Sequence, residues 1–117
     1  MTENSGLSAP EEIVQAQLDA YNARDLALFL SFYLDSIEVF DSPDGQKVID
    51  GKSSLNQTYS RLFADNPSLH CLVQSRIVSG LYVIDHEKVT GIRNGELSTV
   101  VIYKIKDGAI EKVWFAK

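Results

Sequence analysis

Two carboxylates stand two residues apart in the strand-like segment LYVIDHEKVTG. Because side chains alternate between the two faces of a strand, Asp85 and Glu87 share one face. The apolar residues of the same face are Leu81, Val83 and Val89. If that face is buried, the pKa of both carboxyl groups rises, and mutual repulsion raises one of them further, which suits general acid and base catalysis. Two alternatives stay open: the face lies in solvent, or a nearby arginine such as Arg76 neutralises the pair.

A third carboxylate, Asp41, closes an earlier predicted strand. Ile37 and Val39 precede it at alternate positions, so Asp41 lies on the same strand face as two candidate core residues. The strand is expected to stop at the turn-forming residues Ser-Pro-Asp-Gly at 42–45. A curved sheet with helices on its concave side would bring both inward faces towards one space. Asp41, Asp85 and Glu87 are therefore the candidate catalytic residues, expected to share one cavity.

The remaining reactive side chains do not form a recognisable site. His86 lies on the strand face opposite Asp85, and neither His86 nor His70 has a partner motif, so we expect surface or interface roles for both. Cys71 adjoins His70, but neighbours on a strand point to opposite faces, which argues against a nucleophilic pair. No zinc-binding spacing, phosphate-binding glycine loop or dinucleotide fingerprint occurs. The sequence therefore predicts neither a metal nor a cofactor.

Length and charge narrow the class of protein. The 117 residues suit a single domain, which we place at residues 10–117, behind a small, polar and flexible tail at residues 1–9. A net charge of −5 makes nucleic acid and anionic membranes unsuitable partners. No apolar run reaches the roughly 20 residues that cross a bilayer, and the N-terminus lacks a signal-peptide pattern. A single cysteine excludes an internal disulfide, so we expect a cytoplasmic protein.

The elements that must position the carboxylates are three helices followed mainly by strands. Helices are predicted at about 10–22, 25–33 and 52–65, the first closed by Asn22 in the left-handed conformation and the second capped by Asp25. The second helix is apolar nearly all round and should be well buried. Strands are predicted at 37–41, 46–49, 70–79, 81–91, 97–106 and 110–116, with a hairpin turn at Asp107-Gly108. Segregated helices and strands indicate an α+β fold.

Four segments carry a resemblance to a known superfamily. IVQAQLDAYNARDLA resembles the first helix and helix break of ketosteroid isomerases, and IEVFDSP resembles the strand that carries their general base. DGKSSLNQTY resembles the entry to the third helix, and IYKIKDGAIEKVWF resembles the closing hairpin. The chain is thereby identified as a member of the nuclear-transport-factor-two-like superfamily, which includes ketosteroid isomerases and SnoaL-like polyketide cyclases. This resemblance implies a cone of three helices on a curved, mainly antiparallel sheet, with a small apolar or polycyclic ligand inside.

The resemblance also implies roles for single residues. Asp41 takes the position of the general base, and Tyr59 that of an active-site tyrosine. Gln17 and Val101 stand where the isomerases keep the tyrosine and the protonated aspartate of their oxyanion hole, so that hole is incomplete here. The expected ligand contacts are Gln17, Tyr21, Tyr59, Val101, Tyr103 and Phe115. The outer sheet face, with Val100, Ile102 and Trp114, is expected to form a homodimer.

Two classes of function fit these observations. The first is a cofactor-independent isomerase, cyclase or lyase in which Asp41 is the base and Asp85 or Glu87 the acid. The second is a non-catalytic module for ligand binding or dimerisation, because this fold also serves association roles. Convergence of Asp41, Asp85 and Glu87 in one pocket would favour the enzyme; carboxylates turned to solvent would favour the module.

Overall fold

The computed structural model describes residues 9–41, 45–93 and 95–116. Three helices, α1 (Pro10–Asn22), α2 (Leu26–Ser31) and α3 (Lys52–Asp65), pack against one sheet. Its strands are β1 (Tyr33–Asp41), β2 (Gln46–Asp50), β3 (His70–Ser79), β4 (Tyr82–Ile92), β5 (Gly95–Lys106) and β6 (Ala109–Ala116). The expected α+β fold is confirmed. The predicted tail at residues 1–9 and the Ser42–Asp44 part of the predicted turn lie almost wholly outside the described residues.

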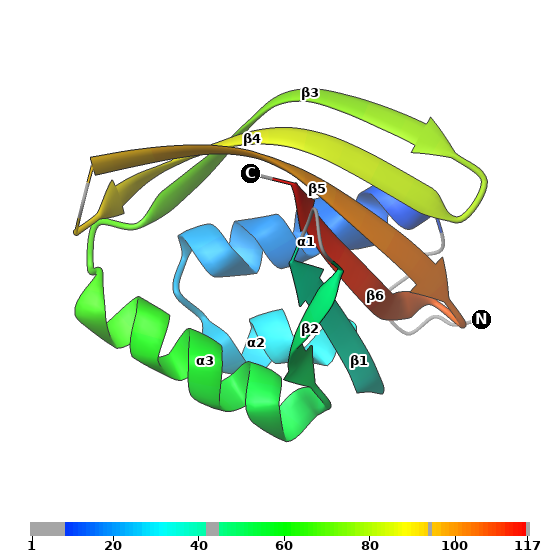
Figure 1. The fold of residues 1–117 in the computed structure, drawn as a ribbon, viewed down its shortest axis with the longest axis horizontal. Coiled ribbons are helices and arrows are strands. Elements are labelled where there is room, and N and C mark those ends of the chain that lie inside the picture. Colours follow the sequence, from blue (N-terminus) through cyan, green and yellow to red (C-terminus); the bar gives the residue numbers. More distant parts are fainter. Residues whose placement is uncertain (1–8, 42–44, 94, 117) are drawn as a thin grey trace.

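The sheet has the strand order β2-β1-β6-β5-β4-β3. β1 pairs in parallel with β6, and every other neighbouring pair is antiparallel. Figure 1 shows the long strands β3, β4 and β5 arching over α1, with α2 and α3 below. The apolar face of α1 lies under the arch, because Ile13, Val14 and Leu18 are buried at helical spacing. None of the helices in the described part of the chain is long and apolar enough to cross a membrane.

The break between the first two helices differs in part from its prediction. α1 ends at Asn22 as expected, but the left-handed residue is Arg24, with φ of 54°. The Asn22 side chain instead binds both backbone groups of Cys71: its Oδ1 accepts from the Cys71 N–H at 2.7 Å, and its Nδ2 donates to the Cys71 carbonyl at 3.0 Å. Asp25 caps α2 as predicted, accepting from the Leu28 N–H at 3.2 Å.

The second helix is shorter and less buried than predicted. It ends at Ser31, and Leu28 is 48% exposed while Phe29 alone is fully buried among its residues. The helix ends early because the chain enters the sheet at the next residues. Tyr33 already pairs with Ile110 of β6, and the Ile110 N–H donates to the Phe32 carbonyl at 2.9 Å. The strand predicted at 37–41 therefore begins at Tyr33. This early start places the Tyr33 side chain inside the molecule.

Candidate functional site

A cavity of about 440 Å³ lies between the helices and the concave face of the sheet. All three helices and all six strands contribute side chains to its wall. At its inner end the wall residues are buried, among them Gln17, Tyr33, Glu87 and Tyr103. At its outer end they are partly or fully exposed: Asp41, Val48, Thr58, Leu62, Ile92, Leu97 and Phe115. We call the end with the buried polar residues the floor of the cavity and the end with the exposed residues its rim.

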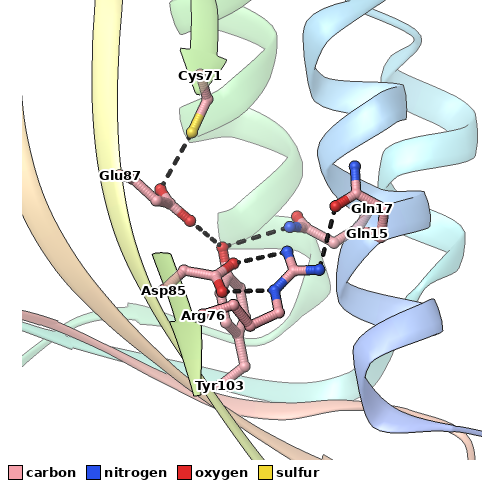
Figure 2. Close-up of polar contacts among 7 residues, drawn as sticks. All are labelled: Gln15, Gln17, Cys71, Arg76, Asp85, Glu87 and Tyr103. Atoms are coloured by element: carbon pink, nitrogen blue, oxygen red, sulfur yellow. Dashed lines mark hydrogen bonds and ion pairs between the residues drawn. The ribbon is translucent and has the colours of Figure 1, made fainter. Parts of the chain in front are cut away.

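Glu87 is the acidic group of the floor. It lies on β4, and only 4% of its surface is exposed. Its Oε2 accepts a hydrogen bond of 3.0 Å from the Tyr103 hydroxyl on β5, and its Oε1 accepts one of 3.3 Å from the Cys71 thiol on β3. These contacts appear as dashed lines in Figure 2. A buried carboxyl held from both neighbouring strands has a fixed position from which to meet a ligand.

A chain of polar side chains continues from Glu87 into α1 and β1. The Gln17 amide Nε2 donates to the Tyr103 hydroxyl at 3.3 Å, and its Oε1 accepts from the Tyr33 hydroxyl at 2.8 Å. Gln17 itself is 2% exposed. Because each polar group of this chain has a partner inside the protein, its burial is compatible with a stable core. The hydrogen bond from Gln17 holds the Tyr103 hydroxyl in place, and this hydroxyl in turn orients the Glu87 carboxyl.

Burial raises the pKa of Glu87 from its ordinary 4.5 to about 7. The hydrogen bonds from Cys71 and Tyr103 and the positive charge of Arg76 oppose this rise, whereas Asp85 adds to it. Burial and the nearby Glu87 carboxylate raise the pKa of the Cys71 thiol, so the sulfur stays protonated near neutral pH and acts as a donor. Glu87 is therefore poised to gain or lose a proton near neutrality.

Asp85, expected beside Glu87 in the cavity wall, is bound to Arg76 instead. It is completely buried, and Arg76 donates to both its oxygens, from Nε at 2.7 Å and from Nη2 at 2.9 Å. The third nitrogen of the guanidinium group, Nη1, donates to the Gln15 side-chain oxygen of α1 at 3.1 Å, as Figure 2 shows. Asp85 is not among the residues that line the cavity. Neutralisation by Arg76, one of the two alternatives, thus holds for Asp85 and not for Glu87.

Asp41 does line the cavity, but at its rim. It ends β1, opposite Phe115 of β6 and Gln46 of β2, and is partly exposed. Phe115, an expected ligand contact, lines the same rim. The cavity therefore has one carboxyl group on its floor, Glu87, and a second at its entrance, Asp41.

The other predicted ligand contacts divide into two groups. Tyr21, Tyr59, Gln17 and Tyr103 line the cavity as expected. Val101 does not: it is completely buried in the core, paired with Asp85 across β4 and β5 and so next to the ion pair rather than to the cavity. The position that the resemblance linked to a second oxyanion donor therefore faces no open space.

The sequence interpretation missed two members of the floor, Tyr33 and Cys71. The helix predicted over residues 25–33 ends with Tyr33, and only the pairing of Tyr33 with β6 reveals it as an inward strand residue. The sequence argues against a pair of Cys71 with His70 but does not indicate the partner of the thiol, which is Glu87. Both histidines are exposed as predicted, and His86 Nε2 lies 3.0 Å from the Ser98 hydroxyl. Among the described residues, no group of three His, Cys, Asp or Glu side chains could hold a metal ion.

Several solved structures share this architecture. A cystatin-fold protein of uncharacterised function from Novosphingobium aromaticivorans has a TM-score of 0.85 at 23% identity, over 95% of this chain and 100% of the other. A candidate polyketide cyclase from Sinorhizobium meliloti has a TM-score of 0.77 at 18% identity, over 97% and 99%. An NTF2-like protein of unknown function from Cytophaga hutchinsonii has a TM-score of 0.77 at 11% identity, over 94% and 91%. At these identities the likeness establishes the fold.

None of the curated proteins matches the chain. The family model of the SnoaL-like domain matches residues 14–113. This range includes the residues of the cavity floor and the ion pair between Arg76 and Asp85. Together with the arched sheet and its three helices, this match identifies the chain as a member of the SnoaL-like family with a nuclear-transport-factor-two-like α+β fold.

Proposed function

We propose that the chain binds a small, largely apolar molecule in the cavity and that Glu87 exchanges a proton with it, as an isomerase, cyclase or lyase would. The observation that carries the proposal is the environment of the Glu87 carboxyl. Glu87 is a buried carboxyl with a pKa of about 7, and it stands on the floor of a cavity whose volume suits a small ligand. A group whose pKa lies near the working pH is the most effective general acid or base.

Each neighbouring side chain has a part in this proposal. Tyr103 and Cys71 hold the Glu87 carboxyl in place through their hydrogen bonds. Asp41, at the rim, serves as the second carboxylate, in the base position that the isomerase resemblance gives it. Asp85 receives no proton-transfer role, because Arg76 occupies both its oxygens.

A nuclear magnetic resonance titration of the glutamate carboxyl carbons tests the proposal without a substrate. We expect Glu87 to titrate at about 7, and 1-adamantanol, a compact neutral probe, to shift the signals of the cavity residues Val89 and Leu97. Glu87→Gln should remove the titration while the probe still binds. Glu96→Gln, at an exposed position paired with Lys88, is the matched control. A Glu87 that titrates near 4.5, together with unchanged signals on addition of the probe, would refute the proposal.

Ligand binding without catalysis is the second candidate function. It is favoured by the lack of the isomerase-type donor pair, because Gln17 is engaged by two tyrosines and Val101 is apolar and buried. Deuterium incorporation beside the carbonyl of bound 2-decalone separates the two functions. A catalytic cavity should accelerate this exchange in heavy water, and Asp41→Asn and Glu87→Gln should each slow it. Binding of the ketone without exchange would favour the non-catalytic function.

A further inference from the structure

Among the described residues that line the cavity, the charged groups are all carboxyls. Its wall carries the carboxyl groups of Asp41 and Glu87, and none of the described lining residues is a lysine, arginine or histidine. Arg76, the cation near the floor, is directed to Asp85 and Gln15 and is not among the lining residues. An anionic ligand would therefore bring a further negative charge into an apolar space whose described wall offers no cation to balance it, which is costly. This wall favours ligands that are neutral or positively charged.

The apolar part of the wall is rich in aromatic rings. The ring of Phe29 lies 4.8 Å from that of Tyr59, 5.0 Å from that of Tyr33 and 6.1 Å from that of Tyr21, between centroids. All four of these residues line the cavity. The faces of aromatic rings attract cations and also contact hydrocarbon favourably. The same wall can hold both the apolar body and the positive head of one ligand.

The carboxyl group of Glu87 has acceptor positions left for a ligand. An ionised carboxylate offers about four acceptor positions, and the protein uses two of those of Glu87, through Tyr103 and Cys71. Burial disfavours an isolated negative charge there, and a cation beside it removes that penalty. A ligand with a charged donor therefore gains more at Glu87 than one with a neutral donor.

We infer that the ligand of this cavity is a small apolar molecule that carries a protonated amine, whose ammonium group donates to Glu87 while its hydrocarbon part contacts the aromatic wall. This inference rests on the proposed function and specifies its ligand class. With the ammonium group bound, Glu87 stays ionised, because the positive charge beside it removes the penalty of burying its negative charge.

The pH dependence of binding should follow Glu87. The groups that act on it from the neighbouring elements are four tyrosines, one thiol and one ion pair. Burial raises the pKa of Tyr21, Tyr33, Tyr59 and Tyr103 and of the Cys71 thiol, so all five are neutral up to at least about pH 9. Arg76 and Asp85 bind each other as a neutral pair. Glu87 is thus the floor group that changes its charge near neutrality.

Three rigid probes of the same shape test the inference: 1-adamantylamine, 1-adamantanol and 1-adamantanecarboxylate. At about pH 8, calorimetry should show the amine binding about tenfold or more tighter than the alcohol, and the carboxylate weakest of all. The advantage of the amine should shrink as the pH falls below about 7, because Glu87 becomes protonated. Glu87→Gln should abolish the advantage, and Glu96→Gln, at an exposed position, should retain it.

A second measurement needs no variant. Saturation with the amine should lower the pKa of Glu87 from about 7, because the ammonium group stabilises the ionised carboxylate, whereas the alcohol should not lower it. Equal binding of alcohol and amine, or an amine advantage that persists in Glu87→Gln, would overturn the inference and leave the proposed function standing. Failure of all three probes to bind would overturn both.

Discussion

The Tyr103 hydroxyl donates a hydrogen bond of 3.0 Å to Oε2 of Glu87, from the strand next to the one that carries the carboxyl. This contact connects the two properties of the cavity floor. It orients the carboxyl, and it stabilises its ionised form, which holds the pKa of Glu87 below the value that burial alone would give. It also links Glu87 to Gln17 and Tyr33. A change at Tyr103 should therefore affect both the pKa of Glu87 and the free energy of unfolding.

Tyr103→Phe should raise the pKa of Glu87 above about 7, because the carboxylate loses one of its two donors. The Gln17 Nε2 group also loses its acceptor, so the free energy of unfolding should fall by about 1 kcal/mol. Titration of the Glu87 carboxyl carbon and urea unfolding measure the two effects. Tyr82→Phe is the control, at an exposed tyrosine. A Glu87 pKa that stays the same or falls in Tyr103→Phe would show that the hydrogen bond does not set the acidity.

The stability of the chain should depend on pH through Glu87. Burial raises its pKa from 4.5 to about 7, so between these values the folded chain holds a proton that the unfolded chain has released. The free energy of unfolding should therefore fall as the pH rises through this window and level off above it. Glu87→Gln should remove this dependence and be the more stable protein at about pH 8, by up to about 3 kcal/mol. Urea unfolding of both proteins across the window measures it; parallel curves would contradict the expectation.

Gly91→Ala should destabilise the chain much more than Gly108→Ala. Both glycines have a positive φ of nearly the same size, +76° and +77°, so each variant carries the strain of an alanine at positive φ. A Cβ at Gly91 would lie 2.0 Å from the Ser68 carbonyl oxygen, whereas a Cβ at Gly108 would meet nothing within 4 Å. The difference between the two variants isolates the collision, and we expect it to exceed about 2 kcal/mol. Equal melting temperatures would show that the loop at Ser68 moves aside without cost.

We expect the chain to form a homodimer through the outer face of its sheet. Cross-strand pairing places five apolar side chains in one row on that face: Ile77, Ile84, Ile102, Trp114 and Phe40. The rings of Phe40 and Trp114 stack at a centroid distance of 5.8 Å, and Ile77 is 62% exposed. A continuous apolar row of this kind favours association with a second copy.

Sedimentation equilibrium measures this association. The wild-type chain should sediment with about twice its mass of 13.0 kDa at micromolar concentration, and Ile84→Lys with Ile102→Lys should sediment as a monomer. Both isoleucines lie on the face opposite the cavity, so the titration of Glu87 should be unchanged in the variant. A wild-type chain of single mass would contradict the expectation.

Local patterns were sufficient to predict most of the fold. Alternation placed Val83, Asp85, Glu87 and Val89 on the buried face of β4, and all four are buried. It failed for Leu81, which precedes the strand and is 54% exposed. The position of the tight turn after β3 is also enough to predict the ion pair. A hairpin closed at Ser79 and Tyr82 brings Arg76 and Asp85 opposite each other.

Alternation along β3 could not place the same arginine. A bulge between Val73 and Ser75 shifts the register, so that Cys71 and Arg76 both point inward although they are five residues apart. Strict alternation would have put them on opposite faces. The start of β1 at Tyr33 depends likewise on its parallel pairing with β6, some 77 positions later at Ile110. Contacts of that sequence separation leave no trace in a local pattern.

The two hydrogen bonds between the Asn22 side chain and the Cys71 backbone bear on self-association at the sheet edge. β3 is an edge strand, and the free backbone groups of such an edge can pair with another chain and seed aggregation. The Asn22 amide bonds to one N–H and one carbonyl there, as a peptide unit of a further strand would. The bulge beside Gln74 interrupts the next stretch of the same edge. The Asn22 side chain and the bulge thus interrupt the regular row of backbone groups with which a strand of another chain would pair.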